Sequence, residues 1–420
     1  MYGDTVVFVN EEGPTFAPDL HDKAVELHDA STDTADVVTL NPPDFSGEPQ
    51  ATVHLPQRVP YGFKGNWVPT TQARRVGAMV DSHQRPYRVI QWFTGDIACH
   101  QIRLIAENPH LELVGAFVWH KEKVGRDAGE IAGIDPLGVI ATDNIDEILS
   151  IDADVVLYNP PRERYDEIVR ILTSGKSVIS IMGGWNPKRY EVWPELKAAM
   201  EVGDSSLSGT GLNPGLSFEL AVLGSSLCHE VESIHIKTCE RQSTMSPVFI
   251  EKFGFGRTEE DLRAGEDGAA EIFDNLLQIT NLICEETGMP FDDASIVFEY
   301  EAATKTYDEK FLIEKGTMAG LVIRAQTTHR GVPKATIEVR FLIGTDWVTP
   351  EFLAQAPDTG WLEVHINGTP EHRFFHEMLE TEKIVRTRST GTRAVNAIPL
   401  IVEAPTGLVL PSMATMPRIL

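Results

Sequence analysis

The residues with the clearest chemical meaning lie in a short turn between an apolar run and an amphipathic run. The apolar run at 88–92 leads into Phe93-Thr94-Gly95-Asp96-Ile97-Ala98. A strand, turn and helix of this kind direct backbone N–H groups and the positive end of a helix toward a phosphate. We therefore predict that a dinucleotide binds through Thr94, Gly95, Asp96, Ile97 and Ala98.

The turn keeps only part of the pattern G-x-G-x-x-G that is typical of dinucleotide sites. Gly95 holds the middle position, where the missing side chain lets the backbone approach the pyrophosphate, and Ala98 holds the third. Taken alone, an ordinary strand-to-helix turn explains these residues about equally well. Asp96 suits a phosphate site only if its carboxylate points outward or caps the helix.

The second apolar run, at 111–119, ends in a basic loop that bears on the choice of cofactor. NAD-binding proteins usually place an acidic residue here for the ribose 2′-hydroxyl, whereas basic residues accommodate a 2′-phosphate. His120, Lys121 and Arg126 follow this run. We predict that they favour NADP(H), with NAD(H) as the alternative. A solvated charged loop competes with this interpretation, since Glu122 lies among the basic residues.

Three further loops follow apolar runs that are typical of parallel strands, so we expect them to converge on the ligand. Asn159 and Pro160 follow the run at 154–158 and are predicted to line the nicotinamide. The loops after 177–182 and 205–210 are predicted to bind substrate through Gly184, Trp185, Asn186, Thr210 and Asn213. A purely structural turn explains Gly209–Gly215 about as well, because Asn213 also suits a helix N-cap.

Spacing alone assigns no catalytic residue. Asn213 and Tyr158 are the catalytic candidates. Tyr158, an ordered water or a histidine of the second half is the candidate proton donor, and these histidines are His229, His235, His329 and His365. No pair of His or Cys residues has the spacing of a metal site, so no metal is expected.

Alternating strands and helices must position these loops. Over 87–215 they predict a Rossmann-type doubly wound parallel sheet that binds the dinucleotide. Over 216–390, alternating strands around a helix at 269–286 predict a second α+β domain with an open antiparallel sheet, for substrate binding and oligomerisation. Asn367-Gly368 predicts a hairpin turn. Residues 391–420 are predicted to form a C-terminal helix, at about 392–402, and a tail that return to the first domain.

Residues 1–86 differ from the rest of the chain. Pro, Asp, Thr and Gly interrupt short apolar runs, which predicts an N-terminal extension of low order. Met79 lies just before the first strand, so a start at Met79 is an alternative hypothesis to a genuine extension. Mass spectrometry of the N-terminal peptide from the native source distinguishes the two, because a peptide from within 1–78 excludes a start at Met79.

Composition limits the classes of partner. The 420 residues include 62 acidic and 36 basic ones, for a formal net charge of −26, which disfavours nucleic-acid binding. The four cysteines are scattered, which is typical of a reducing compartment. No apolar run is long enough to span a membrane. We expect a cytoplasmic homodimer that acts on a small molecule, with no nucleic-acid or membrane partner.

The stretch Gly125–Gly133, Gly-Arg-Asp-Ala-Gly-Glu-Ile-Ala-Gly, resembles the Gly-x-Asp-Ala-Gly-Glu-Leu-Ala-Gly stretch of the dihydrodipicolinate reductase N-terminal-domain superfamily. Residues 87–405 are similar to a branch related to 2,4-diaminopentanoate dehydrogenase and the native amine dehydrogenases, with matches at Gly209–Gly215 and Arg393–Pro399. The resemblance implies nicotinamide-dependent hydride transfer to a C=N or C=O carbon of a small substrate.

The chain departs from that branch at one position that affects the chemistry. In the amine dehydrogenases an acidic pair follows the strand that matches 177–182 and supplies the catalytic carboxylate, whereas Gly183-Gly184 stand here. Three hypotheses remain. The first is an NAD(P)H-dependent amine dehydrogenase or imine reductase. The second is a Rossmann-type protein that binds a cofactor or ligand without turnover. The third is a carbonyl reductase that needs no ammonia.

Overall fold

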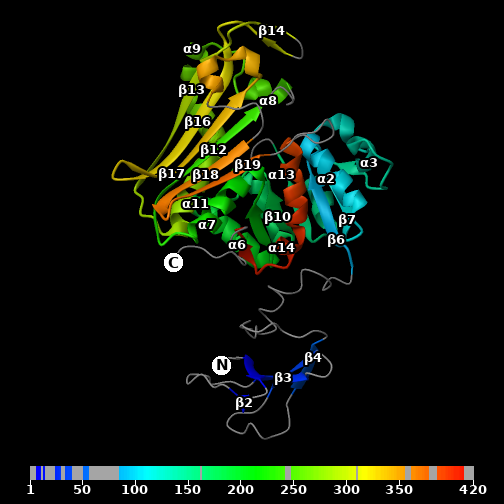
Figure 1. Cartoon of the computed structure of the whole chain (residues 1–420). Helices are drawn as coiled ribbons and strands as arrows, with labels where there is room; N and C mark the ends of the chain where they lie inside the picture. Colours follow the sequence, from blue (N-terminus) through cyan, green and yellow to red (C-terminus); the bar gives the residue numbers. More distant parts are fainter. Residues whose placement is uncertain are drawn as a thin grey trace. The chain divides into compact units, whose positions relative to one another are not determined.

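The computed structural model describes strands at 6–10, 13–14, 24–29, 34–39 and 51–55, and then residues 85–160, 163–241, 247–308, 311–354, 361–377 and 386–410 (Figure 1). The chain forms two compact units, Met1–Val80 and Asp81–Leu420. Met79, the alternative start, lies outside the described residues.

The first unit contains a five-stranded sheet in the order β2-β1-β3-β4-β5. Its strands are β1 (Val6–Asn10), β2 (Gly13–Pro14), β3 (Ala24–Asp29), β4 (Thr34–Thr39) and β5 (Ala51–Leu55). The sequence predicted an extension of low order over 1–86, and its degree of order stays a prediction. Runs such as Val-Val-Phe-Val-Asn concentrate β-branched and aromatic residues, which favour strands even when each run is short.

The second unit begins with a seven-stranded sheet in the order β20-β11-β10-β9-β6-β7-β8, and every pair in it is parallel. The strands are β6 (Tyr87–Trp92), β7 (Leu111–Phe117), β8 (Ala141–Thr142), β9 (Val155–Tyr158), β10 (Ser177–Ser180), β11 (Ser206–Gly209) and β20 (Gly407–Leu408). Chain order reverses between β6 and β9, which is the topological switch point where ligands of such sheets bind. The predicted Rossmann-type sheet is confirmed.

Helices cover both faces of this sheet, because successive residues of a strand point to opposite faces. Val155 and Leu157 of β9 belong to one core, and Val156 and Tyr158 belong to the other. The helices in chain order are α2 (Asp96–Glu107), α3 (Ala128–Ala132), α4 (Ile145–Ser150), α5 (Tyr165–Thr173) and α6 (Trp193–Gly203), with short 3₁₀ turns at Lys121–Lys123 and Pro187–Arg189.

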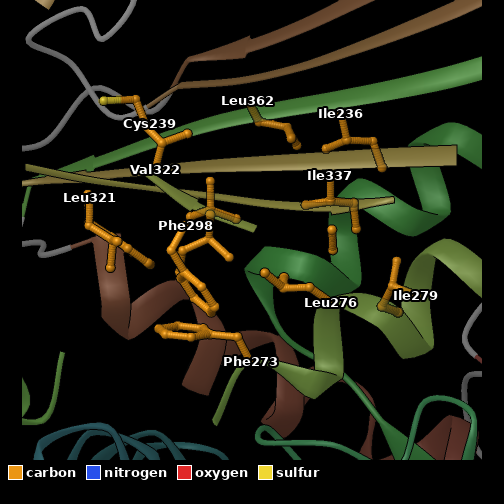
Figure 2. Packing of buried hydrophobic residues seen from close by; sticks show 14 of the residues in the cluster. Ile236, Cys239, Phe273, Leu276, Ile279, Phe298, Leu321, Val322, Ile337 and Leu362 are labelled. Atoms are coloured by element: carbon orange, nitrogen blue, oxygen red, sulfur yellow. The ribbon is translucent and has the colours of Figure 1, made fainter. Parts of the chain in front are cut away.

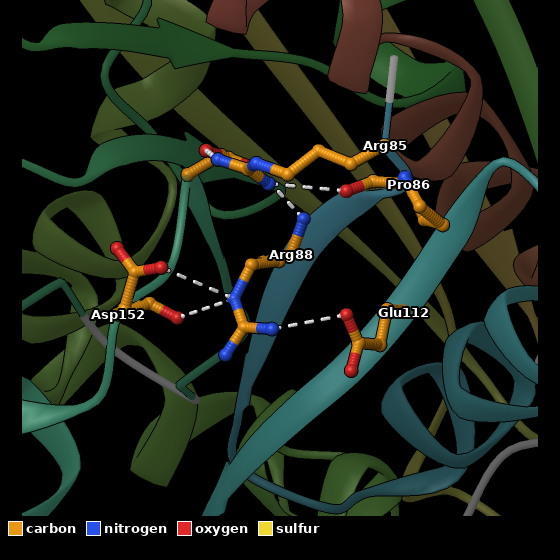
Figure 3. A network of polar contacts seen from close by, with 6 residues as sticks. Arg85, Pro86, Arg88, Glu112 and Asp152 are labelled. Carbon is orange, nitrogen blue, oxygen red and sulfur yellow. Dashed lines mark hydrogen bonds and ion pairs between the residues drawn. The ribbon is translucent and has the colours of Figure 1, made fainter. Parts of the chain in front are cut away.

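Ion pairs join the amino ends of the central strands, at the end of the sheet opposite the ligand loops (Figure 3). Arg88 Nη1 of β6 lies 3.1 Å from Glu112 Oε2 of β7, and Arg88 Nε lies 3.4 Å from Asp152 Oδ2. Arg85 Nη2 lies 2.7 Å from Asp154 Oδ1, just before β9. Partly exposed pairs of this kind contribute about 0–1 kcal/mol each, so they fix register more than they add stability.

The second sheet has the order β13-β16-β17-β12-β18-β19. Its strands are β12 (Glu230–Arg241), β13 (Asp293–Ala302), β16 (Met318–His329), β17 (Val332–Leu342), β18 (Trp361–Thr369) and β19 (His372–Glu377), and a separate small hairpin joins β14 (Tyr307–Asp308) and β15 (Leu312–Ile313). The predicted antiparallel sheet is wrong at one pair, because β12 and β17 run parallel.

One face of this sheet packs on helices α7 (Ser217–Ser225) and α11 (Asp274–Thr287). Figure 2 shows the core between them, where Phe273, Leu276 and Ile279 face side chains of the sheet such as Phe298 and Ile337. Shorter helices complete the domain: α8 (Pro247–Lys252), α9 (Glu259–Ala264), α10 (Glu266–Ile272) and α12 (Pro350–Leu353), with a π turn at Leu212–Leu216 and a 3₁₀ turn at Thr345–Trp347. The single helix predicted at 269–286 is therefore two helices, α10 and α11.

Asn367 and Gly368 are not a hairpin turn, so this prediction is wrong. Both belong to β18, where Asn367 pairs with Ser233 of β12, and the turn to β19 lies at 370–371. A Cβ on Gly368 would lie 2.3 Å from the Glu230 carbonyl oxygen. The glycine therefore permits a close approach at an irregular point of the register, and this use leaves the same sequence signal as a turn.

The C-terminal segment returns to the first sheet. It forms two helices, α13 (Arg386–Asn396) and α14 (Ile398–Val402), rather than the single helix predicted at about 392–402. Pro399, in the first turn of α14, has no N–H to continue the hydrogen-bond ladder, so the helix breaks there. α13 packs on α2 and β20 pairs with β11, so the tail adds the last strand of the parallel sheet.

Candidate active site

The turn between β6 and α2 keeps a left-handed residue at the position of the missing first glycine. Phe93 has a φ of 70°, which glycine adopts far more readily than phenylalanine. Its buried ring lies 6.0 Å from the Phe117 ring, and its N–H donates to the Phe117 carbonyl oxygen over 2.8 Å. Ring packing and this hydrogen bond offset a backbone strain of about 1–3 kcal/mol.

Gly95 and the start of α2 offer space and donors for an anion. No described atom lies within 4 Å of the position that a Cβ would take on Gly95, and its φ of −75° suits any residue. Protein packing therefore does not require glycine here, whereas the close approach of a ligand would. Among the described residues no side chain caps the twelve-residue α2, so its first N–H groups can bind phosphate oxygens.

Two basic residues lie beside this turn. Lys123 Nζ donates to the Thr94 carbonyl oxygen over 2.8 Å and to the Thr94 hydroxyl over 3.1 Å. Arg388 Nη2 of α13 lies 3.4 Å from Asp96 Oδ1. The exposed Asp96 thus pairs with an arginine at the surface, which is the outward orientation that a phosphate site requires. Of the predicted residues, Ile97 and Ala98 lie in the first turn of α2, with Ala98 buried.

The basic loop after β7 is exposed and shares its surface with acidic residues. Lys121 Nζ pairs with Asp143 Oδ2, and this hydrogen bond lowers the pKa of Asp143. His120 Nδ1 lies 3.6 Å from Glu122 Oε1, and Arg126 is exposed. A 2′-phosphate would compete with Asp143 for Lys121, so the contact with a 2′-phosphate stays a prediction.

The stretch Gly125–Gly133 builds the scaffold beside this loop. Asp127 caps α3, and its carboxylate accepts from the backbone N–H groups of Gly129 (2.7 Å), Leu137 (2.9 Å) and Gly138 (2.7 Å). Burial alone would raise the pKa of Asp127, but these backbone hydrogen bonds outweigh it and lower the pKa. The role of this carboxylate is to hold the loop between β7 and β8.

Asn159 lies at the switch point, across from the Gly95 turn. It and the buried Pro160 follow β9, and Asn159 Nδ2 donates to Gln101 Oε1 on α2. Its backbone N–H donates to the Trp92 carbonyl oxygen over 3.3 Å. Asn159 Oδ1 is buried and has no hydrogen-bond partner among the described residues. A buried acceptor without a partner costs free energy that a ligand donor would recover.

Tyr158 is separated from this crevice. It is fully buried in the core on the α5 side of the sheet, and its hydroxyl donates to Glu167 Oε2 over 3.0 Å. Burial raises the pKa of Tyr158 far above its ordinary value, with the Glu167 charge adding to the effect. A phenol that is enclosed in the core and resists ionisation cannot exchange protons with a ligand, so we leave Tyr158 out of the site.

The loop after β10 joins the parallel sheet to α11. Gly184, Trp185 and Asn186 are all buried. The Asn186 N–H donates to Gln278 Oε1, and Asn186 Nδ2 donates to Glu285 Oε2, each over 3.1 Å. Two atoms of the loop, Trp185 Nε1 and Asn186 Oδ1, are buried with no partner among the described residues. These are the atoms of the loop that a ligand could satisfy.

Thr210 and Asn213 follow β11, as predicted substrate residues. Thr210 is buried, and its N–H donates to the Ser180 carbonyl oxygen over 2.9 Å. Asn213 is no N-cap: its Nδ2 donates to Thr238 Oγ1 over 2.9 Å and to Glu240 Oε1 over 3.2 Å, both on β12. Asn213 Oδ1 is buried without a partner among the described residues. Asn213 therefore links the two sheets and keeps an acceptor for a ligand.

Glu163 was not predicted from the sequence. It follows β9, five positions after Tyr158, and Tyr165 Oη donates to its Oε2 over 2.8 Å. Its Oε1 is buried with no partner among the described residues. Burial raises the pKa of Glu163 to about 7, a hydrogen bond from Tyr165 lowers it, and the charge of Asp274 on α11 raises it further. An acidic residue in a loop after a central parallel strand was the available signal.

A hollow of about 210 Å³ lies in the second domain, with residues of α8, α9 and α10 and of the sheet in its walls. Phe253, Phe273 and Phe298 give it an aromatic lining, and Arg257 adds a positive charge. No residue that the sequence predicted for the site lines this hollow. One of its lining residues, Phe273, directly precedes Asp274, whose charge raises the pKa of Glu163.

No helix in the described part of the chain is long and apolar enough to cross a membrane. The described residues also contain no group of three or more His, Cys, Asp or Glu side chains that could hold a metal ion.

Comparisons with known proteins match both halves of the second unit. Residues 93–202 match the family model of the dihydrodipicolinate reductase N-terminus, and residues 218–419 match the 2,4-diaminopentanoate dehydrogenase C-terminal domain. An amine dehydrogenase of Streptomyces virginiae is 26% identical over 354 residues, which cover 76% of this chain and 93% of that protein. A 2,4-diaminopentanoate dehydrogenase of Acetoanaerobium sticklandii is 26% identical over 275 residues, covering 63% of this chain and 74% of that protein.

A solved structure has the same fold. The amine dehydrogenase of Mycobacterium smegmatis superimposes with a TM-score of 0.65 at 18% identity, covering 80% of this chain and 98% of that one. At this identity the likeness concerns the fold alone.

Proposed function

We propose that this chain is an NAD(P)-dependent oxidoreductase acting at an amine or imine carbon. It belongs to the dihydrodipicolinate reductase N-terminal-domain superfamily, in the branch of 2,4-diaminopentanoate dehydrogenase and the amine dehydrogenases. The observation that carries the proposal is the uncapped start of α2 beside the open space at Gly95, at the switch point of a parallel sheet. The two family matches extend over both domains that such a reaction needs.

The residues around the switch point fit a nicotinamide dinucleotide. Gly95 leaves room for the pyrophosphate, and the first N–H groups of α2 supply donors. Lys123 and Arg388 add positive charge beside the turn. Asn159 Oδ1 would accept a hydrogen bond from the carboxamide or a ribose hydroxyl, since both carry donors. When bound, the nicotinamide exchanges a hydride with the substrate carbon.

Acceptor atoms dominate the substrate side of the site. Asn186 Oδ1, Asn213 Oδ1 and Glu163 Oε1 are buried oxygens without partners among the described residues. A ligand that carries N–H donors satisfies such oxygens, whereas a ketone oxygen does not. This balance favours an amine, ammonium or iminium ligand over reduction of a carbonyl without ammonia. The role of these residues is to orient the reacting carbon and to exclude water.

Turnover assays on the purified full chain test the proposal. Small aliphatic and aromatic ketones and aldehydes are incubated with NADPH or NADH, with and without ammonium chloride, and oxidation of the reduced nicotinamide is followed. We expect oxidation that depends on ammonia. Equal oxidation without ammonia would instead identify a carbonyl reductase. Calorimetric binding of the cofactor with no oxidation across the panel would favour the protein that binds without turnover.

The preference for NADP(H) is tested at Lys121. We expect Lys121→Ala to weaken NADPH binding by about 10-fold and to leave NADH binding nearly unchanged, because only NADPH carries the 2′-phosphate. Calorimetric titration of each cofactor gives the ratio. Lys197→Ala, which removes an exposed lysine from α6, serves as the control. Equal losses for the two cofactors in Lys121→Ala would refute the contact.

Assembly, location and domain boundaries stay predictions. We propose a homodimer, which light scattering of the full chain checks directly, and a cytoplasmic location, which fractionation of the native source checks. The proposed dinucleotide-binding domain at 87–215 and substrate domain at 216–390 agree with the separate cores of the two sheets. Limited proteolysis that cuts between these ranges would support that division.

A further inference from the structure

The carboxyl group of Glu163 lies directly against Gly183. Glu163 comes from the loop after β9, and Gly183 comes from the loop after β10, the next strand of the sheet. A Cβ built on Gly183 would lie 2.1 Å from the Glu163 carboxyl carbon. The carboxyl group therefore fills the space that any side chain at position 183 would begin in, and it does so at the carboxyl ends of two parallel strands.

The surroundings of Glu163 differ from those of a structural buried carboxylate. Glu167, on α5, is buried, but Arg164 Nη1 lies 2.9 Å from its Oε1 while Trp92 and Tyr158 donate to its Oε2. Among the described residues, Glu163 has one hydrogen-bond donor, Tyr165, and no ion pair. A carboxyl group with a buried oxygen that lacks a partner lowers the stability of the fold, so this arrangement calls for a functional reason.

The state of protonation suits proton transfer. Burial is the main reason that the pKa of Glu163 rises to about 7, with the negative charge of Asp274 adding to it. Near neutral pH the group is then divided between the acid and the carboxylate, which is where a general acid or base works best. Tyr165 stabilises the carboxylate by donating to Oε2 and leaves Oε1 for a second donor.

We propose that Glu163 is the catalytic carboxylate of this enzyme, and that it reaches the substrate nitrogen from the loop after β9. It would take the role that the acidic pair after the next strand has in the related amine dehydrogenases, where this chain carries Gly183-Gly184. The two features depend on each other, because only glycine at 183 leaves room for the carboxyl group. This inference rests on the proposed function.

The steps balance in the direction of amine oxidation. Glu163 carboxylate takes a proton from the substrate ammonium group, which frees the nitrogen lone pair. The lone pair forms C=N as the C–H hydrogen leaves with its electron pair for the oxidised nicotinamide. Glu163 releases its proton to solvent, accepts one from the water that adds to the iminium carbon, and returns it to nitrogen. The hydroxyl proton passes to the departing ammonia as C=O forms. The protonated amine, water and oxidised cofactor thereby give ketone, ammonium, reduced cofactor and one proton.

Two variants of the full chain test Glu163 in different ways. We expect Glu163→Gln to lower kcat by about 100-fold or more, with the cofactor Kd unchanged, in the assay with ammonium chloride and the best ketone of the panel. The limb of the kcat/KM pH profile with an apparent pKa near 7 should vanish with it. Gly183→Ala leaves the carboxyl group chemically intact but displaces it, so we expect a loss of at least 10-fold. Glu195→Gln, at an exposed site on α6, is the matched control.

Tyr165→Phe tests whether Glu163 is the group that titrates in the pH profile, which a purely structural role for Glu163 would not predict. Removing the hydrogen bond to Oε2 should shift the limb of the pH profile upward, since that bond lowers the pKa of Glu163. Wild-type kcat and an unchanged pH limb in Glu163→Gln would overturn the assignment while leaving the proposed function intact. A wild-type chain that binds cofactor but oxidises none across the panel would overturn the proposed function itself, and the role of Glu163 with it.

Discussion

In the Gly95→Asp variant, NADPH and NADH should both bind at least about 100-fold more weakly than in the wild type, or about 2.8 kcal/mol. Gly95 is the N-cap of α2, and its Cβ position is open. An aspartate there would accept from the first N–H groups of the helix and place a negative charge where the pyrophosphate binds. Calorimetric titration measures the loss.

The same substitution should leave the fold intact. Aspartate is a better N-cap than glycine by a few tenths of a kcal/mol, so the free energy of unfolding should stay equal or rise slightly. Gly268→Asp on α10 is the control, because no described atom lies within 4 Å of its Cβ position either, and cofactor affinity should not change. A folded Gly95→Asp variant with wild-type affinity would show that the phosphates bind elsewhere.

The Asp127→Ala variant should lose about 2–4 kcal/mol of unfolding free energy. Its carboxylate is the acceptor for three backbone N–H groups, those of Gly129, Leu137 and Gly138, and alanine leaves all three without it. Urea unfolding monitored by circular dichroism gives the difference. Asp146→Ala removes an exposed carboxylate that pairs with Arg170 at the surface, so it should cost less than about 0.5 kcal/mol.

The effect of Asp127 should depend on pH in a defined direction. Burial opposes ionisation, but the backbone hydrogen bonds hold the pKa of Asp127 below its ordinary value of 3.8 in the folded chain. A lowered pKa contributes stability above the unfolded value, and this contribution is lost as the pH falls below about 4. The wild type and Asp127→Ala should therefore converge in stability on acidification. A gap that stays constant down to pH 3, about one unit lower, would contradict this account.

The parallel sheet could be predicted from the sequence because local patterns determine it. Buried strands are short apolar runs and their helices are amphipathic, as in α5, where Ile168, Ile171 and Leu172 are buried. The features that were missed depend on contacts distant in the chain. β20 has two residues and is a strand only because β11 offers an edge. Gly368 signals a turn locally, but its backbone meets Glu230 of another strand.

In the candidate site too, features set by local sequence could be predicted and features set by distant contacts could not. The turn at Gly95 and the loops after β9, β10 and β11 could be located from the sequence, because strand ends in such sheets converge. Glu163 could not be found in this way, since its significance depends on the space beside Gly183 in the next loop. Tyr158 was placed at the right strand end, but strand alternation points its side chain into the opposite core.

The seven-stranded parallel sheet takes its strands from both ends of the second unit, and this has a consequence for biosynthesis. The hydroxyl of Tyr87, on β6, donates to Glu403, which lies 316 positions later. During translation the ribosome must deliver the whole second domain before α13, α14 and β20 can close the sheet. Until then the edge of β11 and the apolar side of α2 are exposed to solvent. We therefore expect slow folding of high contact order and a nascent chain that depends on chaperones.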